Sequence, residues 1–172
     1  ASYVGATQVR RMVLGDDDKQ PTPAQLDQMR ELVRQAMRDG AVGVSTSLEY
    51  APAPYAKTDE LIALASEASK FGGIYATHMR NESDAVLPAI DEALRIGREG
   101  HLPVEIWHIK VAGKANCGRM PEVVAKINAA RARTIPRAST SSGARDERSV
   151  VSATPTVPEE AREPIGTTDP PP

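Results

Sequence analysis

The sequence has few aromatic side chains: its 172 residues include one Phe, one Trp and four Tyr. A hydrophobic core must therefore be built chiefly from small and branched aliphatic residues. Apolar residues make up 40% of the chain, which lies within the range of globular proteins. A chain of this length and composition is able to form one domain with a sizeable core.

Three further features limit the classes of function. A single cysteine, Cys117, excludes an internal disulfide and suits a reducing compartment, so a cytoplasmic location is expected. No stretch approaches the roughly 20 apolar residues that span a bilayer, and no membrane association is expected. The net charge of -2 gives no electrostatic basis for binding nucleic acid. The chain begins Ala1-Ser2-Tyr3 without an initiator Met, so we expect a fragment, and nothing in it predicts an oligomeric state.

Hydrophobic periodicity predicts helices that alternate with short buried strands. Residues 1–15 are expected to be a loop with at most a short strand. Thr22 and Gln25 match a capping box, and Pro23 suits the first position of a helix. The spacing of apolar residues predicts helices near 22–40, 58–71, 84–97 and 121–133, and strands near 41–48, 74–78 and 104–108. This order is typical of a parallel α/β sheet with about three βα units, whereas a closed (β/α)8 barrel needs eight.

The composition changes at Thr134. Nearly half of residues 134–172 are Pro, Ser or Thr, and none is aromatic. Such a segment cannot bury enough apolar surface to offset its ordering entropy, so it is predicted to be disordered. The predicted division is a partial barrel over 1–133 and a disordered tail over 134–172.

Two histidines end neighbouring predicted strands and lie thirty residues apart. His78 follows Ile74-Tyr75-Ala76-Thr77, and His108 follows Val104-Glu105-Ile106-Trp107. Since a strand–helix–strand unit returns to the same sheet edge, both imidazoles are expected to emerge side by side. Neutral imidazoles at this edge suit zinc with further ligands, although two histidines with purely structural roles would give the same pattern.

Several motifs resemble one enzyme family. The segments 40–50, 55–64 and 75–82, together with His108-Ile109-Lys110 and Ala112-Gly113-Lys114, resemble N-acyl-D-amino-acid deacylase (D-aminoacylase) of the amidohydrolase superfamily. The resemblance runs over residues 1–133 in one order. It implies part of a metal-dependent TIM-barrel hydrolase, which converts a small-molecule N-acyl-D-amino acid into a carboxylate and a D-amino acid.

The resemblance also implies roles for individual residues. His78 and His108 match zinc ligands of the family, and Tyr50 and Lys110 match positions that line the pocket and hold the substrate carboxylate. For Tyr50, a loop tyrosine packed on the rim is an alternative. For Arg80, a structural role such as pairing with Glu82 is preferred over a contribution to the substrate pocket. His101 matches no motif and is expected in a solvated turn, whereas Cys117 is interpreted as a packing residue.

Other family features lie outside this sequence. It has no His-x-His pair, no zinc-bridging cysteine at a matching position and no general-base aspartate from a last strand, so the catalytic aspartate is expected outside this chain. The break at Thr134 suggests a frameshift as a hypothesis, and the isolated chain is expected to be inactive. Two alternatives remain: a cyclic-amide hydrolase of the dihydropyrimidinase type, or a non-enzymatic truncated or pseudogene product.

Overall fold

A computed structural model describes residues 2–134 and 151–155 of the chain. Five parallel strands form one sheet in the order of the sequence. These strands are β1 (Val4–Gly5), β2 (Gly43–Ser47), β3 (Ile74–His78), β4 (Val104–Ile109) and β5 (Val151–Pro155). Sequential parallel strands with helical connections match the predicted α/β class.

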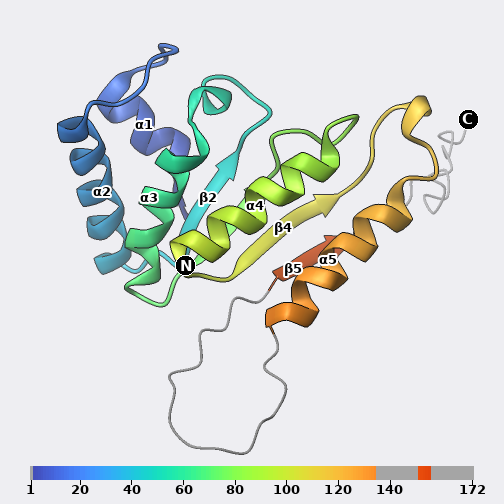
Figure 1. Cartoon of the computed structure of the whole chain (residues 1–172). Coiled ribbons are helices and arrows are strands. Elements are labelled where there is room, and N and C mark those ends of the chain that lie inside the picture. Colours follow the sequence, from blue (N-terminus) through green and yellow to red (C-terminus); the bar gives the residue numbers. More distant parts are fainter. Residues whose placement is uncertain (1, 135–150, 156–172) are drawn as a thin grey trace, which may run out of the picture.

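Helices connect the strands and cover one face of the sheet (Figure 1). They are α1 (Ala6–Leu14), α2 (Pro23–Arg38), α3 (Thr58–Ser69), α4 (Val86–Gly100) and α5 (Met120–Thr134), with short 3-10 turns η1 (Ala53–Tyr55) and η2 (Lys114–Asn116). Each α-helix packs against the next along the chain. None of the helices in the described ranges is long and apolar enough to cross a membrane.

The N-terminal segment differs from its prediction, because residues 6–14 form helix α1 rather than a loop. The apolar pattern did not indicate this helix because its buried face includes a charged residue. Arg10 is fully buried and pairs with Glu60 of α3 at 2.5 Å. Burial raises the pKa of Glu60, while the ion pair with Arg10 opposes that rise. By contrast, the capping box of Thr22 and Gln25 is present as predicted.

Within the segment that was predicted to be disordered, residues 151–155 form β5 beside β4. Pairing with β5 satisfies backbone groups that β4 would otherwise present unpaired at its edge. Thr134, the first residue of the predicted tail, ends α5. The rest of the predicted tail lies outside the described residues.

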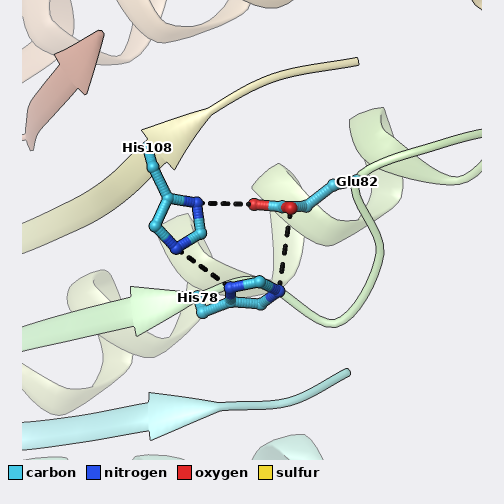
Figure 2. Close-up of side chains that lie close together, drawn as sticks. All are labelled: His78, Glu82 and His108. Atoms are coloured by element: carbon cyan, nitrogen blue, oxygen red, sulfur yellow. Dashed lines mark hydrogen bonds and ion pairs between the residues drawn. The ribbon is translucent and has the colours of Figure 1, made fainter. Parts of the chain in front are cut away.

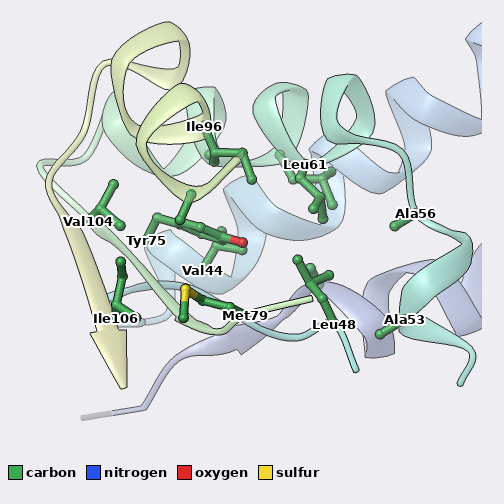
Figure 3. Close-up of a cluster of buried hydrophobic side chains, with 14 of the residues drawn as sticks. Val44, Leu48, Ala53, Ala56, Leu61, Tyr75, Met79, Ile96, Val104 and Ile106 are labelled. Carbon is green, nitrogen blue, oxygen red and sulfur yellow. The ribbon is translucent and has the colours of Figure 1, made fainter. Parts of the chain in front are cut away.

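The core lies between the sheet and its helices and is mainly aliphatic (Figure 3). The parallel register places Val44 beside Tyr75 and Tyr75 beside Val104, so these residues share the face that the helices cover. Leu61 of α3 and Ile96 of α4 pack onto this layer. All five of these side chains are at most 2% exposed.

The opposite face of the sheet is concave. The ring of Tyr3, just before β1, contacts the ring of Trp107 in β4 edge-on, with 5.7 Å between their centroids. Two strands lie between β1 and β4, and at about 4.8 Å per strand a flat sheet would keep them roughly 14 Å apart. The ring contact therefore reflects the curvature of a sheet that forms part of a barrel.

Candidate metal centre

The two histidines meet at the carboxyl edge of the sheet. His78 is the last residue of β3 and His108 is the fifth residue of β4, its neighbour in the sheet. Nδ1 of His78 lies 3.0 Å from Nε2 of His108, and the ring centroids are 4.6 Å apart. Figure 2 shows the rings facing each other across the ends of the two strands. The structure therefore brings together the residues that the spacing predicted to be neighbours.

A local irregularity of β4 accounts for the direction of His108. Thr77 pairs with Ile106, so regular alternation would send His108 to the helix-covered face with Ile106. Instead, the register shifts between Ile106 and Ile109, and His108 has a positive φ of 38°. A non-glycine residue rarely adopts this conformation, and such residues cluster at functional sites. The bulge directs the imidazole toward His78.

In each ring, the outer nitrogen, which is the one that points away from the other histidine, lies next to a carboxylate. Nε2 of His78 lies 2.8 Å from Oε2 of Glu49, which lies two residues after the end of β2. Nδ1 of His108 lies 3.2 Å from Oε1 of Glu82, in the segment between β3 and α4. Glu82 is only 2% exposed, and its Oε2 also pairs with Lys110 and lies 3.7 Å from Nε2 of His78.

This arrangement suits a cation between the rings. When the outer nitrogen of each ring carries the proton and donates it to its carboxylate, the nitrogen that faces the other ring carries a lone pair. The lone pairs of His78 Nδ1 and His108 Nε2 then repel each other across 3.0 Å. A proton or metal ion between them removes that repulsion. A carboxylate behind a ligating histidine is the usual outer partner in zinc sites, so the residues present fit zinc.

Glu82 completes a group of three potential ligands with His78 and His108. One ligand atom from each residue lies within 4.8 Å of the others. Oε1 of Glu82 is buried and has no hydrogen bond, because its 3.2 Å contact with His108 meets the distance for an ion pair but not hydrogen-bond geometry. Three protein ligands are typical of a catalytic zinc site.

Comparison with known proteins identifies the chain's relatives. No protein-family profile matches it. It is 44% identical to the D-aminoacylase of Alcaligenes xylosoxydans xylosoxydans over 133 residues, which is 77% of this chain and 28% of the relative. The N-acyl-D-aspartate deacylase of the same organism is 43% identical over 130 residues, covering 75% of this chain and 26% of that protein.

The chain is a homologue of the D-aminoacylases. A crystal structure of D-aminoacylase superimposes with a TM-score of 0.73 and 37% identity over 86% of this chain and 28% of the relative. N-acyl-D-glutamate deacylase from Bordetella bronchiseptica superimposes with a TM-score of 0.69 and 34% identity, over 73% of this chain and 26% of that one. The chain thus spans about a quarter of these relatives and corresponds to part of the D-aminoacylase barrel, which confirms the predicted family and fold.

Metal ions are described in these relatives. D-aminoacylase has a binuclear metal centre in which one metal activates and the second attenuates. The Bordetella bronchiseptica enzyme was solved with zinc and a phosphonate that mimics the tetrahedral intermediate of its reaction. The histidine pair of this chain therefore belongs to a segment homologous to metal-dependent hydrolases.

The two predicted substrate residues flank the histidine pair. The ring of Tyr50 lies 5.3 Å from that of His78 and is tilted against it, while Tyr50 as a whole remains 60% exposed. Nζ of Lys110 pairs with Glu82 and lies 3.3 Å from Nδ1 of His108. Both residues border the histidine pair, and their assignment to a substrate pocket stays a prediction.

Three other assignments have different outcomes. Arg80 pairs with Glu92 of α4 rather than with Glu82. His101 is exposed and follows the last residue of α4 in a left-handed conformation, in agreement with a solvated turn. Cys117 is exposed, so its interpretation as a packing residue is wrong. It follows the short η2 turn, away from the sheet core.

Sequence reasoning missed Glu49 and Glu82 as members of the site. A signal was present, since Glu49 lies two residues after β2 and Glu82 four residues after His78. Both positions belong to loops at the carboxyl edge, where ligands bind in parallel sheets. An acid in such a loop is also common on an ordinary surface, so spacing alone did not single these two out.

Proposed function

We propose that this chain contributes part of the active site of a zinc-dependent N-acyl-D-amino-acid deacylase. The observation that supports this function best is the facing pair of nitrogens on His78 and His108, backed by carboxylates, in a segment homologous to D-aminoacylase. The reaction is hydrolysis of an amide to a carboxylate and a free D-amino acid. When bound, zinc would polarise the amide carbonyl and lower the pKa of the attacking water.

The chain's own residues would hold the metal and orient the substrate. His78 and His108 supply the nitrogen ligands, and Lys110 supplies a cation for the substrate carboxylate. Tyr50 lies against His78 with most of its surface exposed, which suits a wall of the substrate pocket. An aspartate outside this chain would move the proton, as the general base of the family does.

The first experiment measures zinc binding by the purified chain. Zinc should bind weakly, because the family's remaining ligands lie outside the sequence, and His78→Ala or His108→Ala should raise the Kd by more than about 100-fold. His101→Asn is the matched control, because His101 is exposed and asparagine tolerates a left-handed conformation. An equal affinity for zinc in all four proteins would exclude the histidine pair as the metal site.

The second experiment tests the substrate class. The isolated chain should not hydrolyse N-acyl-D-methionine. When residues 1–133 replace the homologous segment of D-aminoacylase, the hybrid should hydrolyse this substrate, and His78→Ala in the hybrid should abolish the activity. A folded, zinc-loaded hybrid that cleaves no N-acyl-D-amino acid would count against the proposed substrate.

A further inference from the structure

Glu82 is surrounded by basic groups from two strands. Its carboxylate pairs with Nζ of Lys110, lies 3.2 Å from Nδ1 of His108 and lies 3.7 Å from Nε2 of His78. The Glu82 side chain is 2% exposed, whereas the side chains of His108 and Lys110 are 40% and 46% exposed. Figure 2 shows the Glu82 carboxylate contacting the outer nitrogens of both rings. A buried carboxylate at such a junction acts on several groups at once.

The backbone of Glu82 is tied to the same segment as its side chain. The amide of Ala112 donates to the carbonyl of Glu82 at 2.7 Å. Side chain and backbone together thus connect the segment after β3 to residues 108–112 at the end of β4. Glu82 thus contacts both His108 and Lys110, which lie two residues apart.

The position of the carboxylate distinguishes two possible roles. As a metal ligand, Glu82 would share a metal with Nδ1 of His108, the nitrogen nearest to it. However, Nε2 of His108 faces Nδ1 of His78 at 3.0 Å, and the two lone pairs of an imidazole point away from each other. A cation between the rings is therefore bound on the side of His108 that faces away from Glu82. The ammonium of Lys110 also occupies Oε2 of Glu82.

We propose that Glu82 is a positioning residue and not a metal ligand. In the tautomer that carries the proton on Nδ1 of His108, Glu82 would accept that proton across the 3.2 Å contact as well as the ammonium of Lys110, and would so direct Nε2 of His108 at the metal. This inference rests on the proposed function and adds to it. One buried carboxylate sets both the orientation of a zinc ligand and the place of the cation that would hold the substrate carboxylate.

The protonation of the His108 ring provides a direct test. Nitrogen-15 NMR of the metal-free wild-type chain should show the proton on Nδ1 of His108, and the zinc-loaded chain should show the metal on Nε2. Glu82→Met removes the acceptor at similar volume and should shift His108 toward the other tautomer. It should also weaken zinc binding about 10- to 100-fold, the usual effect of losing an outer partner. Glu82→Gln retains an acceptor oxygen and should restore most of the affinity.

The outcomes separate this proposal from the proposed function. A proton on Nε2 of His108 in the metal-free wild type, or zinc on Nδ1, would overturn the role of Glu82. Absence of zinc binding would overturn the proposed function, while the metal-free tautomer would still decide the role of Glu82. Wild-type spectra give this answer even if Glu82→Met does not fold. Glu122→Met, at an exposed acid of α5, is the control and should change neither readout.

Discussion

Arg80 binds Glu92 through two hydrogen bonds, 2.8 Å from Nε and 2.9 Å from Nη2. This forked pair joins the segment after β3 to helix α4. The guanidinium also donates to the backbone carbonyls of Pro54 and Ala56, at 2.8 and 2.9 Å. These carbonyls belong to the loop that carries Glu49 and Tyr50, so Arg80 fixes this loop beside His78. The hydrogen bonds to Glu92 raise the pKa of Arg80 above its ordinary value.

Arg80→Lys should loosen this loop. Lysine cannot reproduce the planar fork, and loss of charged hydrogen bonds at a half-buried site should cost about 2 kcal/mol of the free energy of unfolding. Urea denaturation measures this loss. Hydrogen exchange should be faster at the amides of Tyr55 and Ala56, which are bonded within the loop.

Arg95→Lys provides the matched control. Arg95 binds the carboxylates of Asp59 and Glu99, but its side chain is 43% exposed. Exposed ion pairs contribute little to the free energy of unfolding, so this variant should unfold close to wild type with unchanged loop exchange. Equal effects of the two substitutions would show that Arg80 is an ordinary surface arginine.

Strand order and the meeting of the two histidines could be predicted from the sequence. The apolar run 74–77 and the alternating run 104–107 are separated by one helical pattern, and the chirality of parallel connections returns both ends to the same edge. Alternation alone, however, would have placed His108 on the wrong face. The bulge that corrects this depends on the pairing of β4 with both neighbours, which no local pattern encodes.

The features that could not be predicted depend on charges buried by tertiary contacts. Arg10 interrupts the apolar face of α1, and only its pairing with Glu60 allows that face to be buried. Glu82 resembles a loop acid until Lys110 and His108 approach it from β4. The ion-pair partners Glu60 and Lys110 each lie at least 28 residues away, so short-range periodicity carries no information about them.

Tyr75 should make the stability of the chain sensitive to alkaline pH. Its hydroxyl is 2.8 Å from Thr46 Oγ1, and burial raises the pKa of Tyr75 from 10.0 to about 12. Between pH 10 and 12 the folded state keeps a proton that the unfolded state releases, so stability falls as pH rises. A pKa difference of two units between the folded and unfolded states corresponds to a loss of about 3 kcal/mol in the free energy of unfolding. Urea denaturation from about pH 8 to 12 should show this loss in wild type and not in Tyr75→Phe.

Thr46→Val distinguishes burial from hydrogen bonding. This variant removes the hydroxyl that binds both Tyr75 and Thr77 and should cost about 1 kcal/mol at neutral pH. Because burial is the main cause of the shift, the alkaline loss should persist. Parallel stability curves for wild type and Tyr75→Phe would contradict the assignment of the alkaline loss to Tyr75.

Gly43→Ala should disrupt the start of β2. A Cβ at Gly43 would lie 2.0 Å from the carbonyl oxygen of Ile74 and 2.7 Å from its nitrogen, both backbone atoms of β3. Relief requires that the two strands separate where their pairing begins, so unfolding should become easier by about 3 kcal/mol or more. Gly118→Ala is the control: its φ is +89° and no atom lies within 4 Å of the added Cβ. Gly118→Ala should lower the free energy of unfolding by about 1 kcal/mol, because alanine is strained in the left-handed conformation. Equal stability of the two variants in urea would mean that β2 does not need the close approach at Gly43 to align with β3.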